Sequence, residues 1–108
     1  MTMNELESLR KVIEEAETWH VWLTEYSITH HFMRLVLHQK TFPRGVEILL
    51  MDVLHFTGAL QGGPYRLELV AGSTIVDGPR VSATYLLTGN GGELRIQFAS
   101  ATIERRRT

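Results

Sequence analysis

Residues 81–103 read VSATYLLTGNGGELRIQFASATI, and this stretch predicts a β-hairpin. Two runs of aliphatic, aromatic and β-branched residues flank Asn90-Gly91, a pair that suits a two-residue turn because both central residues need a positive φ. With this pair at the tip, the predicted partners are Tyr85 with Ile96, Leu87 with Leu94, Ala83 with Phe98, Thr84 with Gln97, and Leu86 with Arg95. Turn chemistry and two-residue alternation therefore predict the same register.

The apolar alternation of this stretch slips by one residue after Phe98. Ala101 and Ile103 continue the pattern out of step, which predicts a β-bulge near Ala99-Ser100. Beyond it, the run Arg105-Arg106-Arg107 predicts a solvated basic tail. No aromatic residue is interleaved with these arginines, so the run is more typical of a disordered end than of a nucleic-acid-binding arm.

A second hairpin is predicted over residues 28–57, with its turn at Phe42-Pro43-Arg44-Gly45. Proline suits the first turn position, and glycine suits a left-handed closing residue. Strict turn geometry pairs Phe42 with Val46, whereas a register shifted by two residues pairs Arg34 with Asp52. Both registers leave the same side chains on each face, because a two-residue shift preserves the side.

Both faces of this second hairpin are predicted to be apolar. One face carries Met33, Leu35, Leu37, Leu49, Met51 and Val53. The other carries Phe32, Val36, Leu50, Leu54 and Phe56, with Arg34, Asp52 and His38 among them. A free antiparallel sheet usually has one polar face, so the second apolar face needs a cover. Either the remaining strands curl into a sandwich or partial barrel, or a second copy of the protein packs there.

An ion pair between Arg34 and Asp52 is expected within this second layer. Such a pair fixes the register of two strands more than it stabilises them. The side chains around it are the candidates for a self-contact. The interface candidates are Phe32, Arg34, Val36, Asp52, Leu54 and Phe56.

The other segments complete an α+β fold. Apolar residues at helical spacing predict an amphipathic helix over residues 3–17; they are Leu6, Leu9, Ile13 and Ala16. Residues 58–64 predict a loop, and residues 65–69 predict a half-buried strand. We expect a single domain over residues 1–108, in which the N-terminal helix packs on a five- to six-stranded, mainly antiparallel meander sheet.

Composition excludes several classes of function. The formal net charge is −1, so no overall field recruits nucleic acid or an anionic membrane. The chain has 0 cysteines, which excludes disulfides, thiolate catalysis and cysteine-ligated metals. The charged N-terminal residues predict no signal peptide, and no apolar run is long enough to span a membrane. We therefore expect a cytoplasmic protein without a cofactor.

Candidate chemical sites are weak. The histidine pair His31 and His55 would be neighbours in the second hairpin and could share a metal, although no recognised ligand spacing surrounds them. The simpler interpretation is structural, with the histidines as partly buried amphipathic residues that are hydrogen-bonded to backbone or to neighbouring hydroxyls. Asp52 and Asp77 are not brought side by side by any pattern, so no pair of carboxylates for acid–base catalysis is predicted. We expect a protein that is not an enzyme.

Trp19, Trp22 and Tyr26 form the densest aromatic cluster. If the helix continues this far, the three share one side; in a strand, Trp19 and Trp22 point to opposite faces. Core packing is the simpler interpretation. A docking patch is the alternative, because Trp and Tyr dominate the hot spots of protein interfaces.

The order of a helix, a strand-rich body and the closing hairpin Tyr85-Leu86-Leu87 with Leu94-Arg95-Ile96 resembles small bacterial proteins, some of them immunity proteins of contact-dependent toxin systems. The likeness is one of pattern and implies no residue role. We expect a non-catalytic, self-associating interaction module, with a dimer favoured. The alternatives are an immunity or inhibitor protein that binds a different protein, and a histidine-based metal- or small-molecule-binding protein.

Overall fold

The computed structural model describes residues 3–27, 29, 31–39 and 45–107, which form one helix and eleven strands. Their bounds are α1 (Met3–Glu14), β1 (Trp19–Ser27), β2 (Phe32–His38), β3 (Gly45–Met51), β4 (His55–Thr57), β5 (Gln61–Tyr65), β6 (Leu67–Ala71), β7 (Ile75–Asp77), β8 (Arg80–Ser82), β9 (Tyr85–Gly89), β10 (Leu94–Phe98) and β11 (Ser100–Arg107). The strands make a five-stranded sheet in the order β11-β3-β2-β1-β5, a four-stranded sheet in the order β4-β10-β9-β6, and the separate pair β7-β8.

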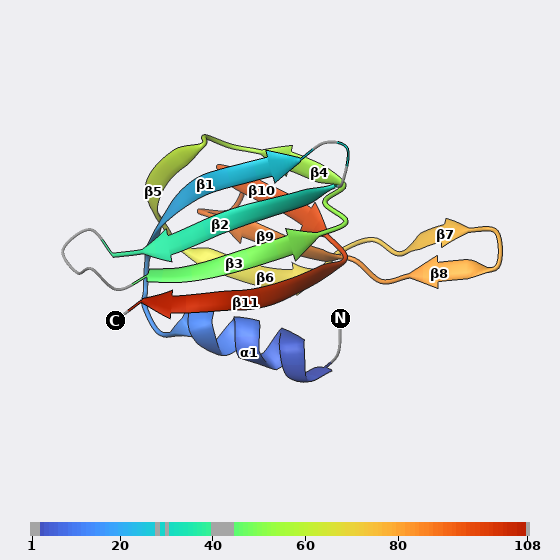
Figure 1. Ribbon diagram of the computed structural model, residues 1–108, viewed down its shortest axis with the longest axis horizontal. Helices are drawn as coiled ribbons and strands as arrows, with labels where there is room; N and C mark the ends of the chain where they lie inside the picture. The colour runs from blue at the N-terminus through green and yellow to red at the C-terminus, as the bar shows by residue number, and fades with distance from the viewer. Residues whose placement is uncertain (1–2, 28, 30, 40–44, 108) are drawn as a thin grey trace.

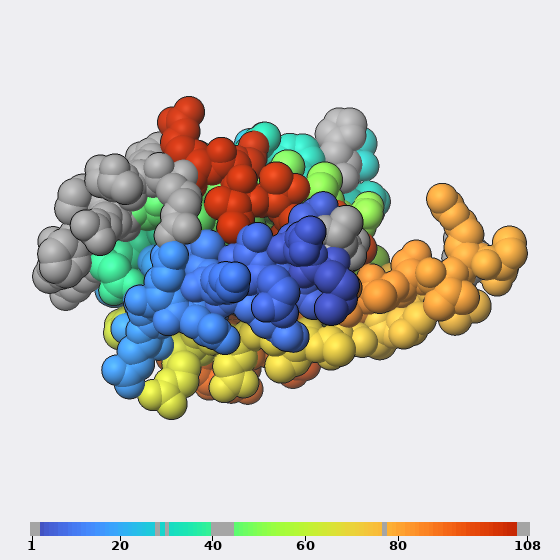
Figure 2. Space-filling view, turned by 90° about the horizontal axis from the view of Figure 1, so that it is seen from below, coloured from blue at the N-terminus to red at the C-terminus, as the bar shows by residue number. Residues whose placement is uncertain are grey.

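The two larger sheets lie one in front of the other and are not closed into a barrel (Figure 1). The chain passes from one sheet to the other between β3 and β4, between β4 and β5, between β5 and β6, and between β10 and β11. Helix α1 lies along the seam where the edge strands β11 and β6 approach each other, and Figure 2 shows it from that side. The α+β class, with an N-terminal helix packed on antiparallel sheet, is confirmed, although the strands are divided among three sheets and do not form one meander.

The core fills the space between the two sheets and beneath the helix. Strand β2 alternates between half-buried and buried residues, as expected for a strand with one face toward a core. Each fully buried aliphatic side chain contributes roughly 1.5–3 kcal/mol to folding. The side chains with less than 2% of their surface exposed and the largest volume are Phe98, Leu9, Met33, Leu35, Leu37, Ile48, Leu50, Leu87, Leu94 and Ile96.

The helix ends at Glu14, three residues before the predicted end at residue 17. Glu14, Glu15 and Glu17 cluster there, and negative charge is unfavourable beside the carboxyl end of a helix. The indole Nε1 of Trp19 donates a hydrogen bond of 2.9 Å to the carbonyl of Ile13, which joins the helix end to β1. Because residue 19 already belongs to a strand, Trp19 points into the core and Trp22 points out.

The pairing of β9 with β10 confirms the last hairpin but shifts its register by two residues. Leu87 lies opposite Ile96 and Tyr85 opposite Phe98, so the predicted partners were wrong while the predicted faces were right. The connection spans residues 90–93 and is longer than the predicted two-residue turn, because the side chain of Asn90 makes hydrogen bonds to other segments. Its side-chain Oδ1 accepts a 2.8 Å hydrogen bond from the backbone N–H of Arg66, and its Nδ2 donates to Glu93 at 3.0 Å.

The slip in the apolar pattern after Phe98 is a change of sheet, not the predicted bulge. Phe98 ends β10 in the four-stranded sheet, and Ser100 begins β11 in the five-stranded sheet. A register shift does occur in β11, but later, between Ile103 and Arg105. The strand continues to Arg107, so the predicted basic tail is instead the end of an ordered strand.

The pairing of β2 with β3 confirms the central hairpin and contradicts both predicted registers. Phe32 lies opposite Met51 and His38 opposite Gly45, which differs from each predicted register by an odd number of residues. An odd shift exchanges the two faces of β3. The predicted turn at residues 42–45 lies outside the described residues, apart from Gly45, which is in β3.

The physical reason for this register is the charge on Glu47. Either predicted register would have placed Glu47 on the same face as Met33, Leu35 and Leu37, and burying an unpaired carboxylate is costly. In the observed register the buried partners of those three residues are Leu50, Ile48 and Val46. Glu47 moves to the opposite face, and Leu49 and Met51 move with it.

The segment predicted as a loop at residues 58–64 is partly a strand. Gln61–Tyr65 forms β5, an edge strand that pairs with β1. Pro64 fits there because an edge strand tolerates the loss of a backbone donor.

The register of β3 is tested by comparing two adjacent leucines. We expect Leu50→Ala to lower the free energy of unfolding by about 2–5 kcal/mol, because Leu50 is fully buried. Leu49→Ala should lower it by less than ~1 kcal/mol, because Leu49 lies on the outer face. Urea unfolding of the two variants, at a concentration where both have the same oligomeric state, measures the difference. Equal losses, or a larger loss at Leu49, would contradict this register.

Candidate interaction site

The outer face of the five-stranded sheet is rich in apolar side chains. Trp22 on β1 is 49% exposed and lies opposite Val36 on β2. Val36 is half-buried, as are Phe32 on the same strand and Leu49 and Met51 on β3. In the part of the chain that the structure describes, no helix or strand lies over this face; α1 covers the seam at its lower edge (Figure 1). The apolar second face predicted from the sequence therefore exists, with different members.

A shallow hollow of about 400 Å³ lies on this face, and we call it the outer-face site. It brings together strands β2 and β3 with the first residue of β11 and the residue after β3. Its lining residues are Phe32, Arg34, Leu49, Met51, Asp52 and Ser100.

Among the residues that the structure describes, Arg34 is the only basic one that lines the hollow, and it is held from two sides. Its Nε donates a 2.8 Å hydrogen bond to Glu104 on β11, and its Nη1 donates to Glu25 on β1. The guanidinium carbon also lies 5.3 Å from the ring centre of Phe32. The hydrogen bonds that Arg34 donates to Glu104 and then to Glu25 raise its pKa above the usual value. Arg34 is thus a permanent, positioned cation on an apolar surface.

The predicted ion pair between Arg34 and Asp52 is wrong. Arg34 lies opposite Leu49 on β3, and its carboxylate partners come from β1 and β11. Asp52 follows the end of β3 with a φ of 54°, in the left-handed region, where the chain leaves the five-stranded sheet. It is exposed at the rim of the outer-face site.

The six predicted interface residues do not share one face. Phe32, Arg34 and Val36 lie together on the outer face, and Asp52 lies at its rim. Leu54 comes after the crossing between the two sheets and is 49% exposed. Its N–H donates to the carbonyl of Gln97 at 2.8 Å. Phe56 belongs to β4 of the other sheet, opposite Ile96, and packs against the core. The crossing between β3 and β4 separates these two from the rest.

The structure does not pair His31 with His55 as the predicted registers did. His31 has a φ of 53° just before β2, and its carbonyl accepts a 2.8 Å hydrogen bond from the N–H of Val53. His55 is in β4, where its Nε2 lies 2.8 Å from the hydroxyl of Thr57. No group of three or more metal-ligand side chains forms among the residues described. Metal binding at these histidines stays a prediction without geometric support.

A different pair of histidines is brought together. His20 on β1 lies opposite His38 on β2, and their rings stack with centres 5.5 Å apart. The stacking places two titratable rings at the far end of the same outer face, away from the outer-face site.

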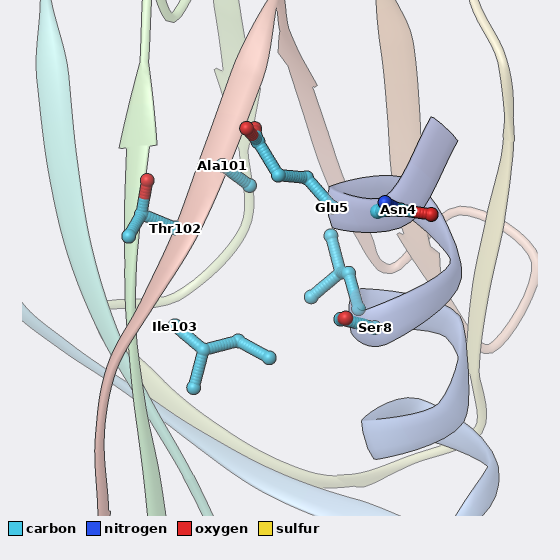
Figure 3. A pocket seen from close by; sticks show the side chains of 7 residues that line it. Asn4, Glu5, Ser8, Ala101, Thr102 and Ile103 are labelled. Atoms are coloured by element: carbon cyan, nitrogen blue, oxygen red, sulfur yellow. The ribbon is translucent and has the colours of Figure 1, made fainter. Parts of the chain in front are cut away.

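A second hollow, of about 350 Å³, lies between α1 and β11 (Figure 3). Leu9, Ala101 and Ile103 make its apolar part, and polar side chains of the helix line its other side. It is the groove left where the helix meets the edge of the sheet. Its lining residues are Asn4, Glu5, Ser8, Leu9, Ala101, Thr102 and Ile103.

The six interface candidates chosen from the sequence left out several members of the outer face, although Trp22 was considered for a docking patch. The sequence did indicate the position of Trp22, because a strand in which Trp19 points into the core makes Trp22 point outward. Leu49 and Met51 were assigned to the inner face through the wrong register. The partnership of Arg34 with Glu104 joins residues 70 positions apart, and no local pattern announces it.

No family model matches the chain, and neither a curated protein nor a solved structure was found to match it. None of the helical residues that the structure describes forms a segment long and apolar enough to cross a membrane. We therefore infer the function from the geometry of the chain.

The role of Asp52 is tested by two substitutions. Its φ of 54° is tolerated by Asp and Asn better than by Ala, so Asp52→Ala should lower the free energy of unfolding by about 1 kcal/mol. Asp52→Asn should change it by less than ~0.5 kcal/mol, because Asp52 holds no ion pair with Arg34. Thermal and urea unfolding check both values. An equal loss in the two variants would restore a role for the carboxylate charge.

Proposed function

We propose that the protein is a non-catalytic interaction module that self-associates through the outer face of its five-stranded sheet, and that it acts in the cytoplasm. One observation carries the proposal: this face presents Trp22, Phe32, Val36, Leu49 and Met51 without a covering element from the described chain. A continuous apolar surface that is open to solvent and has a polar rim is typical of a protein-binding surface.

The composition of the face supports an interaction role. Trp, Met, Phe and Arg are enriched in protein interfaces, and each occurs here. Arg34 is already held by Glu25 and Glu104, so a partner would meet a rigid surface and little ordering entropy would be lost. A cytoplasmic location accords with the absence of cysteine.

A second copy is the proposed partner, with a dimer favoured. Most soluble oligomers are homo-oligomers with closed symmetry, and two-fold dimers are the commonest. A chain of 108 residues has a small core, and association extends the apolar area that it buries.

A lysine in the outer-face site should prevent self-association. We expect wild-type protein to be a dimer by native mass spectrometry, and Leu49→Lys to weaken dimerisation by at least ~10-fold, because a charge would be buried in the contact. The matched control is Val70→Lys, which places the same charge on the outer side of β6, where Val70 is 42% exposed. The control should remain dimeric.

Melting temperatures that match the wild-type monomer, measured at a concentration below dimerisation, would assign the effect to association. A monomeric wild-type protein would contradict self-association and turn attention to a heterologous protein partner, as the inhibitor alternative requires. A dimer that survives Leu49→Lys would show that the contact lies elsewhere.

A further inference from the structure

Strands β7 and β8 form an arm that projects from one end of the body (Figures 1 and 2). The arm lengthens the molecule to 48 Å, against 27 and 24 Å in the other directions. Val76 lies directly opposite Val81, so the two side chains share one face of the hairpin. They are 69% and 68% exposed, and a two-stranded hairpin on its own is only marginally stable in water. The arm thus presents an apolar face that its own chain leaves open.

The base of the arm is fixed to the body by polar contacts around the buried residue Thr84. Thr84 is 2% exposed, and its hydroxyl donates to the carbonyl of Ser73. Gln97 Nε2 donates to the hydroxyls of Thr84 and Ser73 at 3.1 and 2.9 Å, and the N–H of Gly72 donates to the carbonyl of Thr84 at 2.9 Å. A Cβ on residue 72 would lie 2.6 Å from Thr84 Oγ1, so the packing is close. The arm therefore leaves the body in a defined direction.

Strand register places the arm at the same end of the molecule as the outer-face site. At the base of the arm, Ala71 lies opposite Tyr85, which lies opposite Phe98. One residue separates Phe98 from Ser100, which lines the site and lies opposite Met51. A single two-fold axis beyond this end can therefore bring each arm to the other copy's site.

Charge disfavours the simplest alternative, in which two outer faces pack directly on each other. The site and its ion-pair partners bring three carboxylates, Asp52, Glu25 and Glu104, against one cation, Arg34. Two such surfaces in contact would place like charges together. The arm has no such surplus: in it, Arg80 lies opposite Asp77 by register.

Arg80 also gives the arm a means of pairing with the rim of the site. It is exposed and adjacent to Val81 in the chain. By strand alternation its side chain lies on the face of the hairpin opposite to Val76 and Val81, outside the apolar contact. A carboxylate at the rim, such as that of Asp52, is the complementary group.

We propose that the β7–β8 arm of one copy occupies the outer-face site of a second copy, in a reciprocal two-fold exchange. This inference rests on the proposed self-association and names its contact. Val76 and Val81 pack on Phe32, Leu49 and Met51 of the partner copy, and Arg80 pairs with the acidic rim.

Cysteine trapping tests the contact directly, because the chain has 0 cysteines of its own. Val81→Cys and Leu49→Cys are purified separately, mixed, allowed to exchange subunits and mildly oxidised. A disulfide requires the two Cα atoms within about 7 Å, so it reports a specific approach. We expect a covalent dimer in the mixture and none in either variant alone, with the cysteine-free wild type as the blank.

Each other outcome overturns the arm exchange. Covalent dimers of Val81→Cys alone indicate arms paired with each other, and covalent dimers of Leu49→Cys alone indicate outer faces packed together. A wild-type dimer that yields no trapped species contradicts the arm contact and leaves self-association standing. A wild-type monomer contradicts both proposals.

A second measurement does not depend on disulfide geometry. The double variant Val76→Ser with Val81→Ser should weaken dimerisation by about 10-fold, since two apolar side chains leave the contact. Val70→Ser, an exposed valine on the body, is the matched control and should have no effect on dimerisation. Both variants should keep the wild-type melting temperature of the monomer. Unchanged dimerisation in the double variant would overturn the proposal.

Discussion

The pairing of β2 with β3 is the constraint on which the rest of the structure depends. It sets Met33, Leu35 and Leu37 against Leu50, Ile48 and Val46, and this aliphatic layer is the centre of the core. The same register turns Glu47 outward, which avoids a buried, unpaired carboxylate. It also turns Arg34, Leu49 and Met51 outward. The inner layer and the outer-face site are therefore two consequences of one pairing.

The second sheet and the helix cover the inner side of that aliphatic layer and so complete the core. The chain crosses between the sheets four times, so the consecutive strands β3, β4, β5 and β6 alternate between the two sheets. Three positions apart in one strand, Phe98 and Ala101 would point to opposite faces. Because the chain crosses between the sheets at Ala99, both are buried in the core that the sheets share. Helix α1 then covers the seam between β11 and β6 and leaves the outer face of the five-stranded sheet open.

Two features of the molecule are unusual for a chain that acts alone: an apolar outer face with a positioned cation, and a projecting hairpin with exposed valines. Each costs solubility unless something covers it. The outer-face site and the hairpin lie at one end of the body, and the polar contacts of Thr84 hold the hairpin there. A single association in which one feature covers the other accounts for both, and it explains why an apolar face carries an acidic rim.

The sequence by itself determined the α+β class, the helix near the N-terminus, the two main hairpins and the existence of a second apolar face, because these follow from local periodicity and turn residues. It did not determine the register of β3, since residues 28–57 alternate well enough to pair in more than one way, and the buried environment that rejects Glu47 exists only after the sheets pack. Nor did it determine that Ala99 is a crossing between sheets, or that Arg34 meets Glu104, 70 positions away. Those contacts come from the meeting of distant strands, and only the tertiary structure decided them.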